Sequence, residues 1–176
     1  SSPYKIFIYS NDGITWFDGA SSYYHNTINS ISWNGKLFVA GGQNGIYVFL
    51  YSTNGISWLD SSTLQISFIC KNILWNGNKW LAVGSPNNGT YVYVYSFDGQ
   101  YWSNILKTSS ITTGNCVACN TIRENQIIMP GNLMVAVGQA STPTTSNVFA
   151  YSSNGTSWTS GINNSAMSIG KSVAWN

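Results

Sequence analysis

Charged side chains are scarce in this sequence, and their scarcity restricts the functions that the chain can have. They make up 7% of its 176 residues, against about 25% in an ordinary globular domain. Lysine and arginine nowhere form a cluster that would neutralise phosphates, so we expect no nucleic-acid partner. Solubility then depends on Ser, Thr, Asn and Gly, and we expect much of the surface to be covered by a protein partner or by further copies of the chain.

Long hydrophobic runs are also missing. The longest strand-like apolar stretch is Ile46 to Tyr51, far short of the roughly 20 residues of a membrane-spanning helix, so no membrane span is expected. No signal peptide is recognisable. The chain begins with Ser1 and Ser2 rather than Met, and we therefore expect a processed product or an excerpt.

Cysteine is rare, and its spacing gives little indication of metal binding. The three residues are Cys70, Cys116 and Cys119, and Cys116-x-x-Cys119 has the spacing of half a metal site or a redox pair. Residues three apart on a strand point to opposite faces, so this pair should not converge on one ion. We expect Cys119 to lie in the core, and we expect no metal and no cofactor.

The sequence does contain a motif that occurs four times. Tyr-Ser-x-(Asp/Asn)-Gly-x-x-Trp spans residues 9–16, 51–58, 95–102 and 151–158. A second motif, Trp-Asn-Gly or a variant of it, places Trp33, Trp75, Cys119 and Trp175 at the same successive spacings as the four tyrosines. Two independent motifs that keep step indicate a repeat of about 44 residues, as in propellers and solenoids.

Each repeat has the pattern of four short strands, here named A to D. In the second repeat, strand A is predicted at 30–33, and Asn34-Gly35 predicts a tight hairpin turn with both residues at its centre. Strands B, C and D follow at 36–42, 46–52 and 56–58, with no helical periodicity. The third repeat has strands at 72–75, 79–84, 91–96 and 100–102, and the fourth has strand A at 116–119 and strand B at 133–138, after an insertion at 121–130.

These strands predict an all-β fold, a β-propeller of four-stranded antiparallel blades. Residues 1–176 form one expected propeller domain, with repeats at 30–71, 72–115 and 116–170 and partial repeats at 1–29 and 171–176. The chain opens in strand C at 4–10 and closes after a strand A, and strand B of this composite blade is missing. We therefore expect either part of a larger ring or a ring completed by another copy.

The turn motif resembles the Asp-box, or BNR, repeat of sialidase-type propellers, Ser-x-Asp-x-Gly-x-Thr-Trp. The matching residues are Ser10, Asp12, Gly13, Thr15 and Trp16, although the residue between Asp and Gly is missing and two of the four copies carry Asn. The whole unit, which covers nearly the full chain, is similar to repeats in uncharacterised proteins of bacteria and giant DNA viruses. The resemblance implies the propeller architecture and favours an extracellular or virion-associated location.

We expect the motif residues to be structural. The Asp or Asn side chain can bond backbone N–H groups of its own turn, the Gly takes a positive φ, and the Trp packs across the blade, with a sugar-stacking platform as its alternative role. Calcium needs six to eight oxygens, and one carboxylate or amide per blade supplies too few. The set is Asp12, Gly13, Trp16, Asn54, Gly55, Trp58, Asp98, Gly99, Trp102, Asn154, Gly155 and Trp158.

An enzyme is not expected, because the groups that the resemblance would require are missing. Sialidases of this type hold the substrate carboxylate with three arginines, and this chain has only Arg123. Glycoside hydrolysis needs two carboxyl groups that flank the bond. Asp12 and Asp98 belong to the turns. Asp18 and Asp60 occupy equivalent positions in different repeats.

Binding is expected on the face formed by the loops that vary among repeats. The A–B and C–D turns should share one face, and the B–C loops (43–45, 85–90, 139–147) and D–A loops (19–29, 61–71, 107–115, 161–170) the other; binding residues concentrate on such loops. The candidates are Tyr23, Tyr24, His25, Asn87, Asn88 and Thr144. The expected function is a non-catalytic interaction or structural scaffold. The alternatives are a lectin-like propeller that binds glycans and a degenerate sialidase-like hydrolase.

Overall fold

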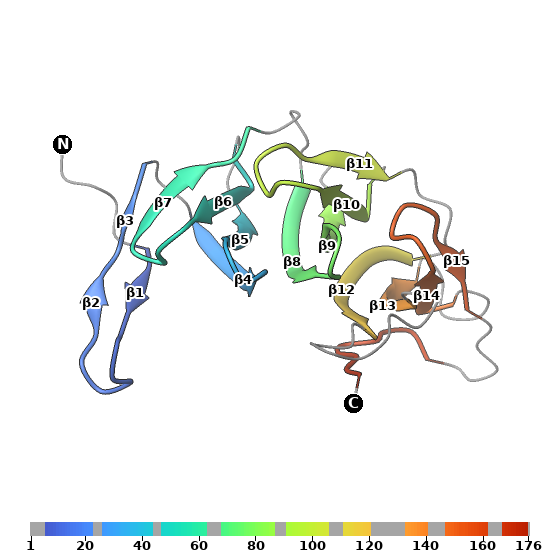
Figure 1. Cartoon of the computed structure of the whole chain (residues 1–176). Coiled ribbons are helices and arrows are strands. Elements are labelled where there is room, and N and C mark those ends of the chain that lie inside the picture. Colours follow the sequence, from blue (N-terminus) through green and yellow to red (C-terminus); the bar gives the residue numbers. More distant parts are fainter. Residues whose placement is uncertain are drawn as a thin grey trace.

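The structure is a computed structural model of the chain, and it describes residues 6–22, 26–43, 47–62, 68–86, 91–105, 111–120, 133–140, 147–161 and 167–175. All of the elements in these ranges are β-strands (Figure 1), so the all-β prediction is confirmed. Within the same ranges, no helix has the length and apolar character needed to cross a membrane.

The strands form four sheets, each built from strands that follow one another in the chain. Sheet I is β1 (Ile8–Tyr9) and β2 (Phe17–Asp18), and sheet II is β4 (Thr27–Trp33), β5 (Phe38–Gln43), β6 (Phe49–Ser52) and β7 (Ser57–Asp60). Sheet III is β8 (Phe68–Trp75), β9 (Trp80–Pro86), β10 (Tyr93–Ser96) and β11 (Ser103–Ile105). Sheet IV is β12 (Ile111–Cys119), β13 (Met134–Ala140), β14 (Phe149–Ser152) and β15 (Thr159–Ser160).

Antiparallel pairing of each strand with the next gives sheets II to IV the predicted A-B-C-D order. Sheet I corresponds to strands C and D. The short strand β3 (Ala20–Ser21), which follows sheet I, pairs in parallel with β7 at the D edge of sheet II. At the next sheet, Ser62, which follows β7, forms a parallel bridge with Tyr101 just before β11.

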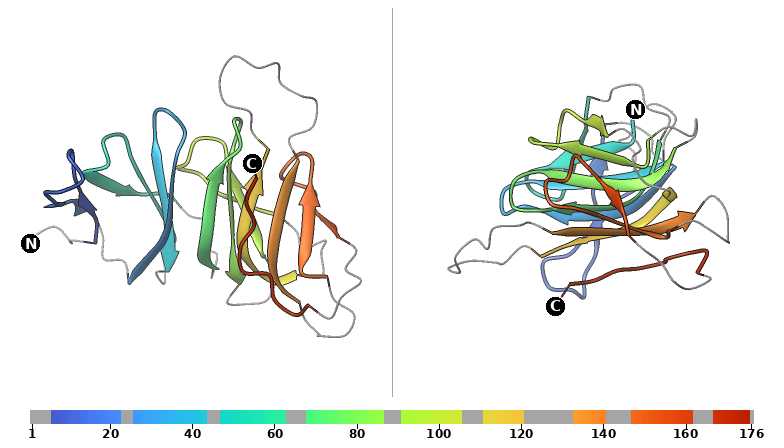
Figure 2. Two further views of the ribbon diagram at one scale, coloured as in Figure 1. Left: turned by 90° about the horizontal axis from the view of Figure 1, so that it is seen from below. Right: turned by 90° about the vertical axis from the view of Figure 1, so that its right-hand side faces the viewer.

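The sheets lie side by side in an open arc, with β1 and β2 at one end and sheet IV at the other (Figure 1). The A strands β4, β8 and β12 lie on the inner side of the arc and contact one another in that order, whereas β7 and β11 lie on the outer side. The C-terminal segment 167–175 runs beside sheet IV, where Ile169 bridges to Gln139 of β13 (Figure 2).

The A strands are longer than predicted, because each contains a β-bulge. The predicted strands began at 30, 72 and 116, but β4, β8 and β12 begin at Thr27, Phe68 and Ile111, inside the predicted D–A loops. The register shifts at the same place in each repeat, so that Asn29, Lys71 and Asn115 are the extra residues. A bulge breaks the alternation of side chains, and the alternation is what the sequence prediction followed.

Two further boundaries are corrected. Strand D of sheet III was predicted at 100–102, but β11 begins at Ser103, and Tyr101 instead forms an isolated parallel bridge with Ser62. The A–B turn is shifted by one residue: Asn34 N–H donates to the Leu37 carbonyl, so Gly35 and Lys36 form its centre. Asn34 flanks the turn, where its Oδ1 accepts the N–H groups of Lys36 and Leu37.

The core lies between the sheets rather than within any one of them. One cluster joins sheets II and III around Phe49 and Trp102, a second joins sheets III and IV around Tyr93 and Trp158, and a smaller one joins sheets I and II around Trp58. Each sheet is therefore stabilised mainly by its neighbours, and the faces at the two ends of the arc lack one neighbour each among the described residues.

Candidate functional site

The C–D turn of every sheet is held by the side chains of its own motif. In the first turn, Asp12 Oδ1 accepts backbone N–H bonds from Ile14 and Thr15 at 2.8 and 2.7 Å. The Ser10 hydroxyl donates to the same oxygen at 2.9 Å and accepts the N–H of Gly13 at 2.8 Å. The same four bonds occur in the turns of Asn54, Asp98 and Asn154.

This geometry explains why Asp and Asn alternate in the motif. All of the bonds to the Asx side chain end on one oxygen, Oδ1, which an amide supplies as well as a carboxylate does. The motif glycines have φ values between 73° and 77°, a region that other residues resist. The repeated polar residues thus satisfy the backbone of their own turns.

The two carboxylates in these turns have lowered pKa values. For Asp12, the hydrogen bonds from the Thr15 and Ile14 backbone hold the pKa of the carboxyl well below its usual range. For Asp98, burial raises the pKa, but the bonds from Tyr101, Gln100 and Ser96 outweigh it, so the net direction is also downward. Among the described residues, no group of three or more His, Cys, Asp or Glu side chains could hold a metal ion.

Stacked aromatic rings join each sheet to the next. Phe7 stacks on Trp58 with ring centroids 4.0 Å apart, Phe49 on Trp102 at 3.7 Å, and Tyr93 on Trp158 at 4.4 Å, all within 9° of parallel. In each pair the first ring lies two residues before the motif Tyr of one repeat, and the second is the motif Trp of the following repeat. These are repeat-equivalent contacts, so one junction is built three times.

Bonds from the A strands reinforce the same junctions. The bulged residues Asn29 and Asn115 donate through Nδ2 to the carbonyls of Cys70 and Gly170 in the next repeat, both at 2.8 Å. The third bulged residue, Lys71, donates to Asn115 Oδ1 at 2.9 Å. The bulge therefore directs one side chain of each A strand across to the neighbouring A strand.

A further pair of bonds links the same strands one residue later. Ser30 Oγ accepts the N–H of Ile73 at 3.1 Å, and Asn72 Oδ1 accepts the N–H of Val117 at 3.1 Å. Both acceptors lie at the same position of their repeat, three residues before the second-motif Trp or Cys. An acceptor at this position therefore satisfies the backbone of the following A strand.

The A–B turn of one sheet meets the C–D turn of the next, so both turn types share one face. Leu37 and Val39 lie so close to Gly99 that a side chain at Gly99 would overlap them. The equivalent Lys79 donates from Nζ to the Asn154 carbonyl at 3.0 Å and lies about 5 Å from the Phe97 ring centre. Burial lowers the pKa of this amine. The face also carries the exposed rings of Phe97 and Tyr101.

The expectation of a buried motif Trp is wrong for the first copy. Trp58, Trp102 and Trp158 are 2% to 3% exposed, whereas Trp16 is 56% exposed. The three buried rings each pack under a ring from the preceding repeat, and among the described residues no ring stacks on Trp16. The burial of this Trp is therefore supplied by the neighbouring repeat and not by its own sheet.

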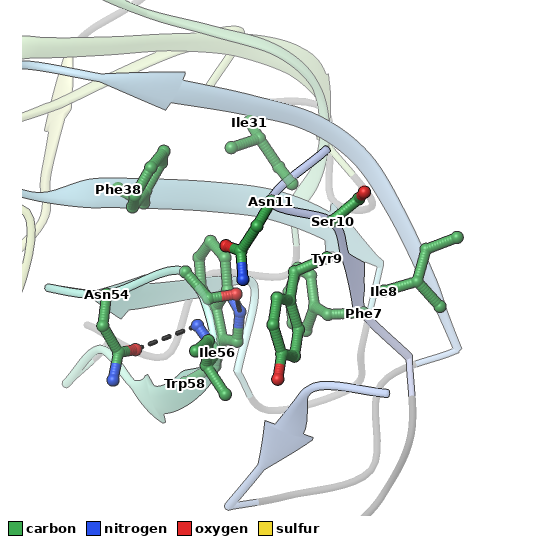
Figure 3. Close-up of a pocket in the computed structure, with 11 residues that line it drawn as sticks. Phe7, Ile8, Tyr9, Ser10, Asn11, Ile31, Phe38, Asn54, Ile56 and Trp58 are labelled. Atoms are coloured by element: carbon green, nitrogen blue, oxygen red, sulfur yellow. Dashed lines mark hydrogen bonds between the residues drawn. The ribbon is translucent and has the colours of Figure 1, made fainter. Parts of the chain in front are cut away.

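An apolar cavity of about 300 Å³ lies at the same end of the arc, between β1 and sheet II (Figure 3). Sequence reasoning did not find it, because it arises where a neighbouring A and B strand are missing from the described residues. Its lining residues are Phe7, Ile8, Tyr9, Ser10, Asn11, Ile31, Phe38, Asn54, Gly55, Ile56 and Trp58.

The described residues that line the cavity include no carboxylate and no histidine. Its polar side chains are hydroxyls and amides, of which Ser10 and Asn54 are engaged in their own turns. Figure 3 shows Ile31 and Phe38 on one side of this space and Tyr9 on the other. The site thus has the composition of a packing surface for apolar side chains.

The loop residues predicted to bind a ligand lie outside the described residues. These are Tyr23, Tyr24, His25, Asn87, Asn88 and Thr144, and they remain predictions. Of the remaining acidic residues, Asp18 and Asp60 lie at equivalent ends of β2 and β7 on different sheets, and Asp60 accepts a 2.8 Å bond from the Ser22 hydroxyl.

The two cysteines of the CxxC pair point to different neighbours. Cys116 Sγ contacts the Val173 carbonyl at 3.5 Å, and Cys119 Sγ contacts the Trp75 carbonyl at 4.0 Å on the opposite side of β12. Cys119 is partly buried against the core between sheets III and IV. All three cysteines are free thiols, and burial raises the pKa of the Cys70 thiol. The pair does not converge on one point.

Comparison with known proteins adds no functional information, so the functional conclusion rests on the geometry described above. No protein-family model matches the chain, and no curated protein matches it.

Proposed function

We propose that the chain is a non-catalytic interaction scaffold whose sheets are blades of a β-propeller. One observation carries this proposal: the polar side chains that recur in every repeat are used to hold turns and junctions. Asp12 and Asp98 each accept two backbone bonds and one hydroxyl bond in their own turns. A chain whose repeated polar residues stabilise its turns and junctions forms a rigid framework, and such a framework is suited to presenting binding loops.

The repeated junction supports the propeller assignment. In a propeller, four-stranded sheets are arranged radially with the first strand innermost, and here β4, β8 and β12 adjoin one another on the inner side of the arc. A small-angle X-ray scattering profile of the protein tests it. A propeller assembly, in one chain or several, should give a compact disc, whereas an extended rod would contradict the assignment.

Partners are expected at the face opposite the Asx turns, on the B–C and D–A loops. The test compares two block variants in a pull-down of partners from a native extract. Tyr23→Ala/Tyr24→Ala/Asn87→Ala/Asn88→Ala alters the loop face, and Phe97→Ala/Tyr101→Ala removes two exposed rings from the turn face. Loss of a partner in the first variant and its retention in the second is expected. The reverse result would place binding on the turn face and contradict the proposal.

A glycan array separates the scaffold from the lectin alternative. The scaffold should bind no glycan, and it should not hydrolyse chromogenic sialosides or glycosides. Sugar-competable binding that is lost in Tyr23→Ala/Tyr24→Ala would replace the scaffold by a lectin. Turnover that survives repeated purification would replace it by a hydrolase.

A further inference from the structure

The two ends of the arc carry opposite halves of one junction. At one end, Trp16 occupies the position of the stacked tryptophans, but no ring of the described residues stacks on it. At the other end, Phe149 occupies the position of Phe7, Phe49 and Tyr93, each of which stacks on the tryptophan of the following repeat. Phe149 is partly exposed, whereas those three rings are buried. Among the described residues, the first end thus lacks the ring that would stack on Trp16, and the second end lacks the tryptophan that would stack on Phe149.

The inner edge shows the same complementarity. Ile31 of β4 is 50% exposed, while its equivalents Ile73 and Val117 are 4% to 5% exposed beneath the preceding A strand. In those two cases the backbone N–H is bonded by Ser30 or Asn72 of that strand. Ile31 lines the cavity of about 300 Å³, where such a strand would lie (Figure 3).

The segment 167–175 has the chemistry of the missing strand. It follows sheet IV at the place of a further A strand, since Asn115 donates to the Gly170 carbonyl as Asn29 does to Cys70. Its Ser172 is exposed and stands at the position of Ser30 and Asn72, the two acceptors. Lys171 stands at the position of Lys71, which bonds the next A strand through Asn115.

We propose that these ends bind each other between two copies of the chain, head to tail. Trp16 of one copy stacks on Phe149 of the next, and segment 171–175 of that second copy enters the cavity beside Ile31. Ser172 then accepts the Ile31 N–H, as Ser30 accepts that of Ile73. The inference rests on the repeat junction and not on the loop face proposed for partners.

The composition of the open end suits an interface of this kind. Ile8, Ile14, Trp16, Phe17 and Ile31 are all large, apolar and exposed there, and aromatic and apolar residues are enriched in interface cores. The contact is heterologous, because it joins two different surfaces of the chain. Such contacts give closed rings where the rotation closes and open filaments where it does not.

Sedimentation velocity over a wide concentration range tests the proposal. The wild-type protein should form species that grow with concentration, and Trp16→Ala should weaken self-association by about tenfold or more, as expected for a central aromatic residue. Ser172→Arg, at an exposed residue of the other end, should have the same effect without altering a core. Phe97→Ala/Tyr101→Ala, which removes two rings of the turn face, should associate as the wild type does.

A mixture of end-blocked variants makes the test specific. Trp16→Ala retains the end that carries Phe149, and Ser172→Arg retains the end that carries Trp16. At a concentration at which the wild type associates and each variant alone stays monomeric, the mixture should therefore form a heterodimer that grows no further. A wild-type chain that stays monomeric at all concentrations would overturn the proposal. This holds whether acrylamide quenches the fluorescence of Trp16 or a contact within the same chain protects it. Partner binding by Trp16→Ala through the loop face would show that the proposed function stands independently.

Discussion

Gly41 of β5 and Cys70 of β8 face each other so closely across the junction of sheets II and III that a side chain on Gly41 would overlap Cys70 Sγ. The equivalent positions in the next two junctions are Val83 with Gly114 and Val137 with Gly170, where a side chain on the glycine would meet the valine Cβ at 2.7 Å. One member of each pair is small and the other is larger. In the first junction the glycine lies on the B strand, whereas in the other two it lies on the A-strand side.

This exchange of sizes gives a double-mutant test. Gly41→Val should destabilise the protein by about 1–3 kcal/mol through overpacking, and Cys70→Gly should destabilise it by opening a void in the buried cluster. The double variant recreates the Val–Gly pair of the other junctions. Its loss of unfolding free energy should therefore be smaller than the sum of the two single losses, with a coupling energy of about 1–3 kcal/mol. Urea unfolding of the four proteins measures this. Additive losses would show that the two positions do not share one space.

The carboxylates in the turns predict acid sensitivity. The folded-state pKa values of Asp12 and Asp98 are lowered, so the stability they contribute is present above the unfolded pKa of about 3.9 and is lost as the pH falls below it. Asn54 and Asn154 make the same bonds without titrating. In Asp12→Asn/Asp98→Asn, the unfolding temperature should therefore fall less between pH 5 and pH 2 than in the wild type. An equal fall in both proteins would be evidence against this.

The motif serine is predicted to matter most where it is buried. Ser96 is buried and accepts the N–H of buried Gly99, so Ser96→Ala should leave that donor unsatisfied and cost about 1–3 kcal/mol. Ser10 makes the same bond to an exposed Gly13, and water can replace it there. Ser10→Ala is thus the matched control, with a loss of less than about 0.5 kcal/mol in chemical unfolding. Similar losses in the two variants would contradict the role of burial.

Replacement of a stacked tryptophan should lower the free energy of unfolding far more than replacement of Trp16. Trp58 is buried beneath Phe7 and donates from Nε1 to the Gly55 carbonyl at 3.0 Å. Trp58→Ala should cost about 3–5 kcal/mol, and Trp16→Ala, at a low protein concentration, less than about 1 kcal/mol. Thermal unfolding of both variants checks the difference. A large loss for Trp16→Ala in a monomeric sample would mean that its own sheet buries it.

Local signals explain how much of the fold was predictable. Strand order and turn positions follow from side chains that act within a few residues, such as Asn34 and Asp12. The start of each A strand was missed because the bulged residue, for example Lys71, is selected by a contact in the next repeat. The exposure of Trp16 was missed for the same reason, since repeat periodicity assigns the same environment to every copy and cannot register a neighbour that is missing.

The candidate site was predictable only in part. The structural role of the motif residues can be argued from the chemistry of an Asx turn, and the structure shows the corresponding bonds. The cavity at Ile31 is formed by residues distant in sequence, and no local pattern marks it. The loop candidates from Tyr23 to Thr144 are supported by the variation of the loops alone, and they stay predictions.

The uniformity of the junctions also bears on how such a chain can change its length. Residues 72–115 span one repeat and carry both members of one junction, Val83 of β9 and Gly114 of β12. An in-frame duplication of this segment would meet, at both new boundaries, the contacts that it already makes. Gene duplication can therefore add or remove whole sheets without any compensating substitution. The number of sheets is then free to vary, while the contacts at each junction stay the same.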